Sequence, residues 1–203
     1  MPKIETSSIV EQREWRRRNL IESAAELAIE SGGRVVTISA VARRAGVSRT
    51  AIYEYFASSS DLIAEIIMAE LDGYAKTLDE ACKGHFSAEA KIEAWVRTSL
   101  EYIADGRHML AKSINATSLP ASREREVALA HQRLVAPLHA SLKKLGLRDI
   151  TLAIELIRKA TDVAATRIDG GAPAGDEIKD CLTFVMAGVN ALSTLKPVSS
   201  ATD

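Results

Sequence analysis

The stretch Thr37–Phe56, TISAVARRAGVSRTAIYEYF, decides the fold of this chain. Its first half repeats small apolar residues at the i, i+3, i+4 and i+7 spacing of a helix face, at Ile38, Val41, Ala42 and Ala45. Thr37 precedes this helix and can cap it with its hydroxyl. Gly46 follows the helix, where a chain that turns sharply takes a positive φ. The pattern predicts a short helix that ends in a tight turn.

A second short helix is predicted directly after the turn. Ser48 is a favourable N-cap, and Ile52 and Phe56 fall on one face because they are four residues apart. The outer face is polar and carries Arg49, Thr50 and Tyr53. Two short helices joined by a tight turn, with a polar face on the second, are typical of a helix-turn-helix whose second helix enters the major groove of DNA.

The run AGVSRTAIYEYF, followed by a Ser-rich loop and by Asp-Leu-Ile at the start of a long helix, resembles the DNA-binding domain of TetR (tetracycline-repressor-like) transcriptional regulators. The resemblance is specific over Arg16 to Ile67, and elsewhere it covers only length and helical character. It implies an all-α fold of about nine helices. Residues 1–60 would form the helix-turn-helix domain, with a mobile tail over residues 1–11, and residues 61–203 a larger helical domain for ligand binding and dimerisation.

Composition and charge agree with this interpretation. Only nine of the 203 residues are aromatic, whereas Ala, Leu, Glu and Arg are plentiful, a balance that favours helices over a β-sandwich or barrel. The net charge is −1, yet residues 31–60 hold four Arg against one Glu, so positive charge gathers where DNA would lie. The chain has no apolar run long enough for a signal peptide or a membrane span, and we expect a cytoplasmic protein with no membrane partner.

Helix boundaries can be drawn along the rest of the chain from periodicity and from Gly and Pro residues. A first helix is expected over residues 11–31, with Leu20, Ala24, Leu27 and Ala28 on its inner face. A fourth is expected to begin at Ser60 or Asp61 and to run toward Ala81. Further helices are expected at residues 88–104, 107–118, 122–145, 149–168 and 176–195, with Pro137 kinking or splitting the third of these.

The last two expected helices carry broad apolar stripes. One stripe holds Ile154, Ile157, Thr161, Ala164, Ala165 and Ile168, and the other holds Ile178, Cys181, Leu182, Val185, Met186, Val189 and Leu192. Two such helices from each of two chains could form a four-helix interface, the homodimer that the resemblance implies. The alternative is that both stripes belong to the core of a single chain.

The resemblance also assigns roles at the DNA end, residue by residue. It implies that Thr37, Ser48, Tyr53 and Tyr55 hold phosphates and that Ser39, Arg49 and Thr50 face base edges. Arg49 could bind the O6 and N7 atoms of guanine, or it could contact only phosphate. One of the two tyrosines could instead pack under the first helix.

Two charged positions at the DNA end leave alternatives open. Glu54 departs from the family pattern, and its repulsion from DNA would be offset if it accepted a hydrogen bond from a cytosine amino group or paired with Arg49 or Arg43. The basic run from Arg16 to Arg18 could reach a phosphate or form a solvated face balanced by Glu11, Glu14 and Glu22.

Candidate effector contacts lie in the second domain. Trp95, Ser99 and Tyr102 share a helix face, and neighbouring helices add Met109, Asn115 and His131 as further groups around an otherwise apolar cavity. No cofactor and no metal are expected, because Cys82 and Cys181 are too few and too distant for a zinc site or a disulfide framework.

These patterns predict a ligand-responsive DNA-binding regulator, a repressor that leaves a palindromic operator when a small molecule binds. A change of about 1–3 kcal/mol in operator binding would accompany ligand binding, through a tilt of the helix that starts near Asp61. The alternative is a dimeric DNA-binding regulator without a small-molecule ligand, which a core without a cavity would favour. An enzyme is not expected, because phosphate loops, nucleophile elbows and metal-ligand spacings are missing from the sequence.

Overall fold

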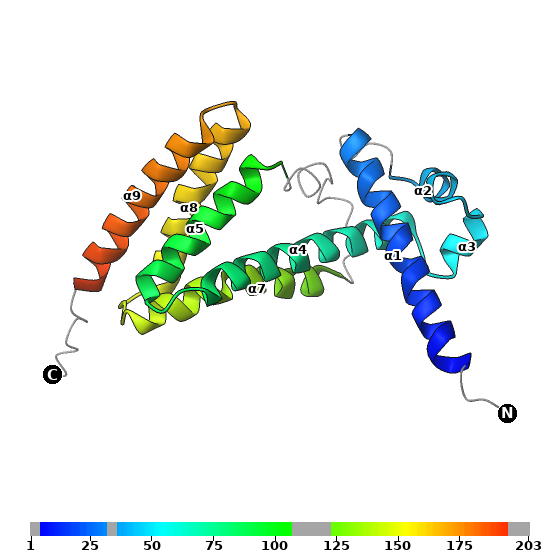
Figure 1. Ribbon diagram of the computed structural model, residues 1–203, viewed down its shortest axis with the longest axis horizontal. Helices are drawn as coiled ribbons and strands as arrows, with labels where there is room; N and C mark the ends of the chain where they lie inside the picture. The colour runs from blue at the N-terminus through cyan, green and yellow to red at the C-terminus, as the bar shows by residue number, and fades with distance from the viewer. Residues whose placement is uncertain (1–4, 32–35, 107–122, 195–203) are drawn as a thin grey trace. The chain divides into compact units, whose positions relative to one another are not determined.

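The computed structural model describes residues 5–31, 36–106 and 123–194, and these residues form eight helices and no strand (Figure 1). The helices are α1 (Glu5–Ser31), α2 (Ile38–Ala45), α3 (Arg49–Tyr53), α4 (Ser59–Lys83), α5 (Ala88–Ala104), α7 (Glu124–Lys144), α8 (Ile150–Asp169) and α9 (Ala174–Thr194). The all-α prediction is confirmed. The expected helix over residues 107–118 lies outside the described residues.

Most helix boundaries lie close to the predicted ones, and α5 matches its predicted range. The main correction concerns α1, which begins at Glu5, so residues 5–11 are helical and not part of a tail. No Gly or Pro interrupts that segment. Pro137 lies inside α7 and does not split it.

The described residues divide into two compact units. The first unit comprises residues 5–31, 36–71 and 123–129, and the second comprises residues 72–106 and 130–194. The division falls inside α4 and inside α7. The domain boundary expected after residue 60 stays a prediction about which part of the chain folds independently.

The first unit packs the helix-turn-helix against α1. On α1, three of the four residues predicted on its inner face, Leu20, Ala24 and Ala28, are buried, and the fourth, Leu27, is half-buried. The largest fully buried side chains of this unit are Phe56, Ile52, Leu62, Ile66 and Val41, contributed by α2, α3, α4 and the segment after α3. This shared core fixes how the two short helices are presented.

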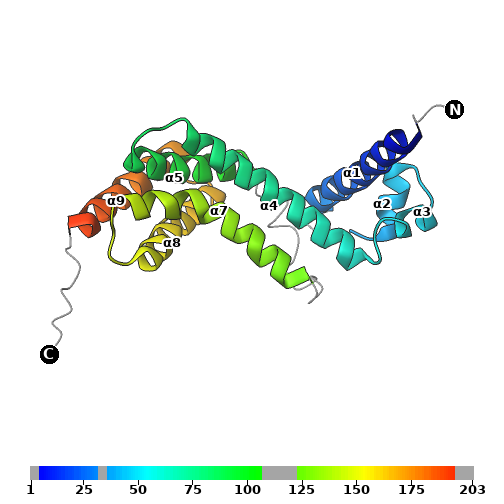
Figure 2. The same ribbon diagram turned by 90° about the horizontal axis from the view of Figure 1, so that it is seen from below.

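The second unit is a helical bundle in which α5, α8 and α9 lie side by side (Figures 1 and 2). Its core includes Leu78 of α4, Leu100 of α5 and Leu142 of α7, all fully buried. Ile157, Thr161 and Ala164 of α8 and Ile178, Leu182, Val185 and Val189 of α9 are buried in the same bundle. The stripes predicted as a dimer interface therefore pack largely into the core of this unit, because α5 covers them.

In the part of the chain that the structure describes, none of the helices combines the length and the apolar character needed to cross a membrane.

Candidate nucleic-acid interface and effector cavity

The local geometry of the helix-turn-helix follows its sequence. The Thr37 hydroxyl accepts a hydrogen bond from the Ala40 amide at 3.2 Å, and the Ser48 hydroxyl accepts one from the Ala51 amide at 3.1 Å. Gly46 has φ +67°, and the next amide, of Val47, donates to the Ala42 carbonyl at 3.0 Å. Both predicted caps and the predicted glycine turn are confirmed.

Six of the seven predicted DNA contacts have exposed side chains on this motif. They are Thr37 and Ser39 at α2, and Ser48, Arg49, Thr50 and Tyr53 at α3. The opposite faces are buried, through Ile38, Val41 and Ala42 on α2 and Ile52 on α3. The structure therefore brings these six residues together on the outer surface of two consecutive helices.

Tyr55 differs from the other six because it is half-buried. The Arg13 guanidinium carbon of α1 lies 5.8 Å from the centre of its ring, a distance typical of a cation–π contact. Arg13 also donates to the Glu54 carbonyl oxygen, at 3.5 Å. Of the two tyrosines, Tyr55 thus packs against the first helix, and its contact with phosphate stays a prediction.

Ion pairs within the protein decide which arginines of the helix-turn-helix keep a free positive charge for DNA. Arg44 binds both carboxylate oxygens of Glu30, at 2.6 and 2.7 Å, and one oxygen of Glu26 at 3.0 Å. The hydrogen bonds that Arg44 donates to Glu30 hold the pKa of the Glu30 carboxyl below its usual range and raise the pKa of Arg44. Neither Arg43 nor Arg49 joins an ion pair within the described residues. Arg49 therefore keeps an uncompensated positive charge at the start of α3.

Glu54 is exposed and forms no ion pair among the residues that the structure describes, so the pairs with Arg49 or Arg43 considered from the sequence are not formed there.

Within the basic run from Arg16 to Arg18, Arg17 follows neither of the two alternatives considered from the sequence. Arg16 and Arg18 are exposed, whereas Arg17 pairs with Glu65 of α4 and lies over the ring of Phe56, 5.7 Å from its centre.

The second unit contains a cavity of about 240 Å³ among α4, α5, α7 and α8. Its lining includes three of the predicted effector contacts, Trp95, Ser99 and His131. Tyr102 lies behind this lining, stacked on Tyr74 at 4.3 Å between ring centres, and Tyr74 itself lines the cavity. Met109 and Asn115 lie outside the described residues. The sequence did not point to Ile103, Leu134, Val135 or Arg158, and it assigned Thr161 and Ala165 to a dimer stripe.

Several polar groups of this cavity are already satisfied by the protein. The Trp95 indole N–H donates to the Leu134 carbonyl at 2.8 Å, and the Ser99 hydroxyl donates to the Trp95 carbonyl at 2.7 Å. Burial raises the pKa of the Tyr74 phenol, although a hydrogen bond with Ser99 acts in the opposite direction. Two charged side chains line the cavity: the exposed Arg158, which joins no ion pair within the described part of the chain, and Asp162, which pairs with Lys159 at 3.3 Å.

Neither cysteine has the setting of a reactive thiol. Cys82 and Cys181 are buried, and burial raises the pKa of both thiols. Over residues 5–31, 36–106 and 123–194, no group of three or more His, Cys, Asp or Glu side chains is arranged to hold a metal ion.

Comparison with known proteins identifies relatives of this arrangement. Residues 20–66 match the family model of the bacterial regulatory proteins of the tetR family. The HTH-type transcriptional repressor KstR2 of Rhodococcus jostii is 26% identical over 185 residues, which cover 86% of this chain and 91% of that protein. The fatty acid metabolism regulator protein of Bacillus subtilis is 24% identical over 102 residues, about half of each chain.

Solved structures share the fold. The transcriptional regulator FadR from Bacillus subtilis, solved in complex with stearoyl-CoA, superposes with a TM-score of 0.69 over 84% of this chain and 98% of its own. Its sequence identity is 19%, so this likeness speaks for the architecture: an N-terminal helix-turn-helix followed by a helical C-terminal part.

Proposed function

The chain belongs to the tetR family of bacterial regulatory proteins, DNA-binding transcription factors rather than enzymes, and we propose that it is a homodimeric repressor that leaves a palindromic operator when a small molecule binds its second unit. A named repressor among its relatives supports repression rather than activation. The proposal has three parts, which concern DNA, the dimer and the effector.

The observation that carries the DNA part is the exposed face of α3. Arg49 stands at its first position with no ion pair among the described residues, and Thr50 and Tyr53 are exposed beside it. A guanidinium in this position can bind guanine with two hydrogen bonds, an interaction that discriminates against other bases by about 1–3 kcal/mol. We assign base reading to Ser39, Arg49 and Thr50, and phosphate contacts to Thr37, Ser48, Tyr53 and Tyr55.

A dimer through α8 and α9 is supported by apolar side chains that the bundle leaves uncovered. Leu152, Leu156 and Val163 of α8 and Phe184 of α9 are between 44% and 70% exposed. Leu156 and Phe184 border a small apolar hollow with Gly188, whose missing side chain leaves open space above the helix. A second copy that covers this face would pair two recognition helices, and such pairs bind successive major grooves about 34–36 Å apart.

The effector part rests on the cavity of the second unit. Its volume lies just below the range of about 300–1,000 Å³ usual for small-molecule sites, which favours a compact ligand. Trp95, Leu134 and Val135 offer an apolar wall, and Arg158 can pair with an anionic or strongly polar group. The proposed effector is therefore a compact, mainly apolar molecule with one such group. The cavity favours this function over a regulator that has no ligand.

The test begins with the selection of bound duplexes from a random-sequence library by the purified full-length protein. We expect enrichment of an inverted repeat. Arg49→Ala should bind that repeat about 5- to 150-fold more weakly and should bind unrelated duplexes almost as well as the unmodified protein. If no sequence is enriched, or if Arg49→Ala retains full preference for the repeat, the assignment of α3 as the base reader is wrong.

A further inference from the structure

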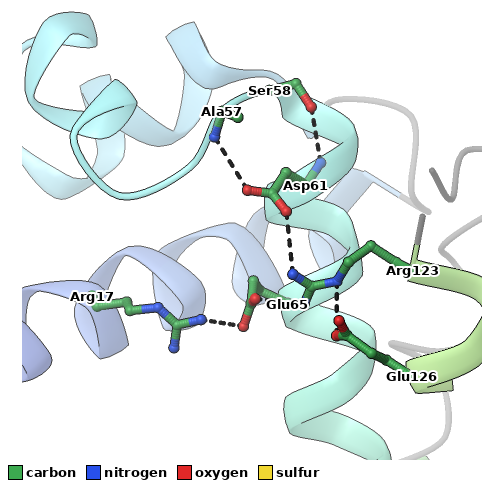
Figure 3. Close-up of polar contacts among 7 residues, drawn as sticks. All are labelled: Arg17, Ala57, Ser58, Asp61, Glu65, Arg123 and Glu126. Atoms are coloured by element: carbon green, nitrogen blue, oxygen red, sulfur yellow. Dashed lines mark hydrogen bonds and ion pairs between the residues drawn. The ribbon is translucent and has the colours of Figure 1, made fainter.

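A partly buried group of charged residues lies next to the helix-turn-helix in the first unit (Figure 3). We call Arg17, Asp61, Glu65, Arg123 and Glu126 the Glu65 cluster. Glu65 of α4 lies between Arg17 of α1 and Arg123, which directly precedes α7 (Figure 3). Arg17 binds one oxygen of the Glu65 carboxylate, and the Nη2 atom of Arg123 donates to the other at 2.5 Å. Three segments distant in sequence thus meet on one carboxylate.

Arg123 pairs with two acidic residues besides Glu65. Its Nη1 atom donates to Asp61 Oδ1 at 3.4 Å, and its Nε atom lies 3.0 Å from Glu126 Oε2 in an ion pair. The side chains of Glu65 and Arg123 are only 16% and 21% exposed. A planar guanidinium can contact several carboxylates at once in this way, whereas a lysine ammonium is a single point charge. The identity of residue 123 therefore matters to this cluster.

The Glu65 cluster contacts the end of the recognition motif at two points. The Arg17 guanidinium lies over Phe56, which is fully buried and whose amide donates to the Ile52 carbonyl of α3 at 3.0 Å. The Asp61 carboxylate accepts a hydrogen bond from the Ala57 amide at 3.1 Å. Phe56 and Ala57, shortly after the end of α3, are thus held by side chains that depend on Glu65 and Arg123 for their own pairing.

We propose that Arg123 is a positioning residue for DNA binding: through Glu65, Arg17 and Asp61 it fixes the segment after the recognition helix, and loss of its contacts lowers operator affinity. This inference rests on the proposed function. The proposal makes Arg123 the residue through which regulation reaches the recognition motif, because residues 130–144 of α7, the helix that follows Arg123, belong to the second unit. A change in α7 would reach the recognition motif through this side chain.

The test uses the full-length protein and the duplex that the unmodified protein selects. Arg123→Gln and Glu65→Gln are each expected to weaken binding by about threefold to thirtyfold. The double variant is expected to be no weaker than the weaker single variant, because both changes break one network. The matched control is Arg133→Gln, which removes an arginine of α7 that also pairs with α4, at Asp72, but at an exposed site in the second unit. The control should bind within twofold of the unmodified protein.

A second readout separates positioning from general stability. In Arg123→Gln, amide hydrogen exchange in peptides that cover residues 49–57 should accelerate, while exchange in α9 stays close to the control value. Arg123→Lys should give an intermediate operator affinity, because one ammonium replaces one of several contacts.

The proposal is overturned if Arg123→Gln binds the duplex as tightly as the control does, if the two single effects multiply in the double variant, or if exchange over residues 49–57 is unchanged. If the unmodified protein selects no duplex, the proposed function fails. The exchange measurement, which needs no DNA, then still decides whether Arg123 positions the recognition motif.

Discussion

Arg44 and Glu30 are joined by two hydrogen bonds of 2.6 and 2.7 Å, so that one of the arginines of the helix-turn-helix is committed to α1. Arg44 also pairs with Glu26, and its charge is thereby compensated within the protein. Arg49 has no such partner among the described residues. Two arginines five positions apart therefore have different roles, one in packing α2 on α1 and one at the outer surface.

This difference predicts the salt dependence of DNA binding. Each cation that neutralises a phosphate adds about 0.9 to the slope of log affinity against log salt concentration. Arg44→Gln should therefore leave that slope nearly unchanged, because Glu26 and Glu30 already neutralise Arg44, and Arg49→Gln should lower it by less than about one, because Arg49 is assigned to a base edge and not to a phosphate. Anisotropy titrations between 50 and about 200 mM salt measure both slopes. A slope lowered by about one in Arg44→Gln would show that Arg44 faces the phosphates.

Two glycines predict opposite changes in stability. Gly46 has φ +67°, so Gly46→Ala should lower the free energy of unfolding by about 1–2 kcal/mol. Gly73 lies inside α4 with open space around the position of an added Cβ atom, so Gly73→Ala should raise it by about 0.5–1 kcal/mol. Urea unfolding of the two variants gives both values. A loss at position 73 equal to that at position 46 would contradict this account of the turn.

The proposed dimer predicts that Phe184→Asp is monomeric in sedimentation velocity and loses most of its operator affinity. A charge on a face that a second chain covers would be buried without a partner. Phe86→Asp is the matched control, because Phe86 is fully exposed and lies in the loop between α4 and α5, so it is not part of the apolar face of α8 and α9. A Phe184→Asp protein that remains a dimer would place the interface elsewhere.

The Glu65 cluster predicts a defined pH dependence of stability. Burial by itself would raise the pKa of Glu65, but hydrogen bonds from Arg123 and Arg17 outweigh it, and the pKa lies below its usual range. The resulting stabilisation is present above the unfolded-state pKa of about 4.3 and is lost as the pH falls through the lower, folded-state value. Glu65→Gln should therefore cost about 1–2 kcal/mol at pH 7 and progressively less as the pH is lowered below about 4.

Urea unfolding of both proteins across this pH range measures the effect. Asp72→Asn serves as the control, since it removes an exposed pair worth less than about 1 kcal/mol. A cost for Glu65→Gln that grows as the pH falls would have the wrong sign for this cluster.

The cavity predicts binding of a compact apolar anion, for which the dye 8-anilinonaphthalene-1-sulfonate is a convenient probe. Its fluorescence should rise on binding, and Ala165→Phe should abolish the rise because the new ring occupies the cavity. Arg158→Gln should weaken dye affinity, whereas Arg97→Gln, on an exposed site of α5, should not. Phe184→Asp controls for dye bound to the face of α8 and α9. Unchanged dye binding in Ala165→Phe would locate the site elsewhere.

Local features of this protein could be predicted from its sequence because they depend on neighbouring residues. The caps at Thr37 and Ser48 and the turn at Gly46 need only residues a few positions apart, and all three are present in the structure. The same holds for the range of α5, which Ser87 caps and which is followed by Asp105 and Gly106. Periodicity also identified Leu20, Ala24 and Ala28 as the buried side of α1.

Features that depend on residues distant in sequence could not be predicted. The role of Arg17 is set by Glu65 and Phe56, and that of Arg123 by Glu65 and Asp61, and no local pattern links these positions. The stripes of α8 and α9 were ambiguous for the same reason. A helix face can pack against its own chain or against a second copy. Only the position of α5 shows that the stripes of α8 and α9 pack against their own chain.

The most direct test of the central claim is the ratio of two affinities, measured by fluorescence anisotropy in the same buffer. One duplex carries the selected inverted repeat, and the other carries the same bases in scrambled order. A specific regulator is expected to bind the repeat at least about a thousandfold more tightly at physiological salt, with one dimer per repeat. Equal affinity for both duplexes would contradict the claim that α3 of this protein reads an operator sequence.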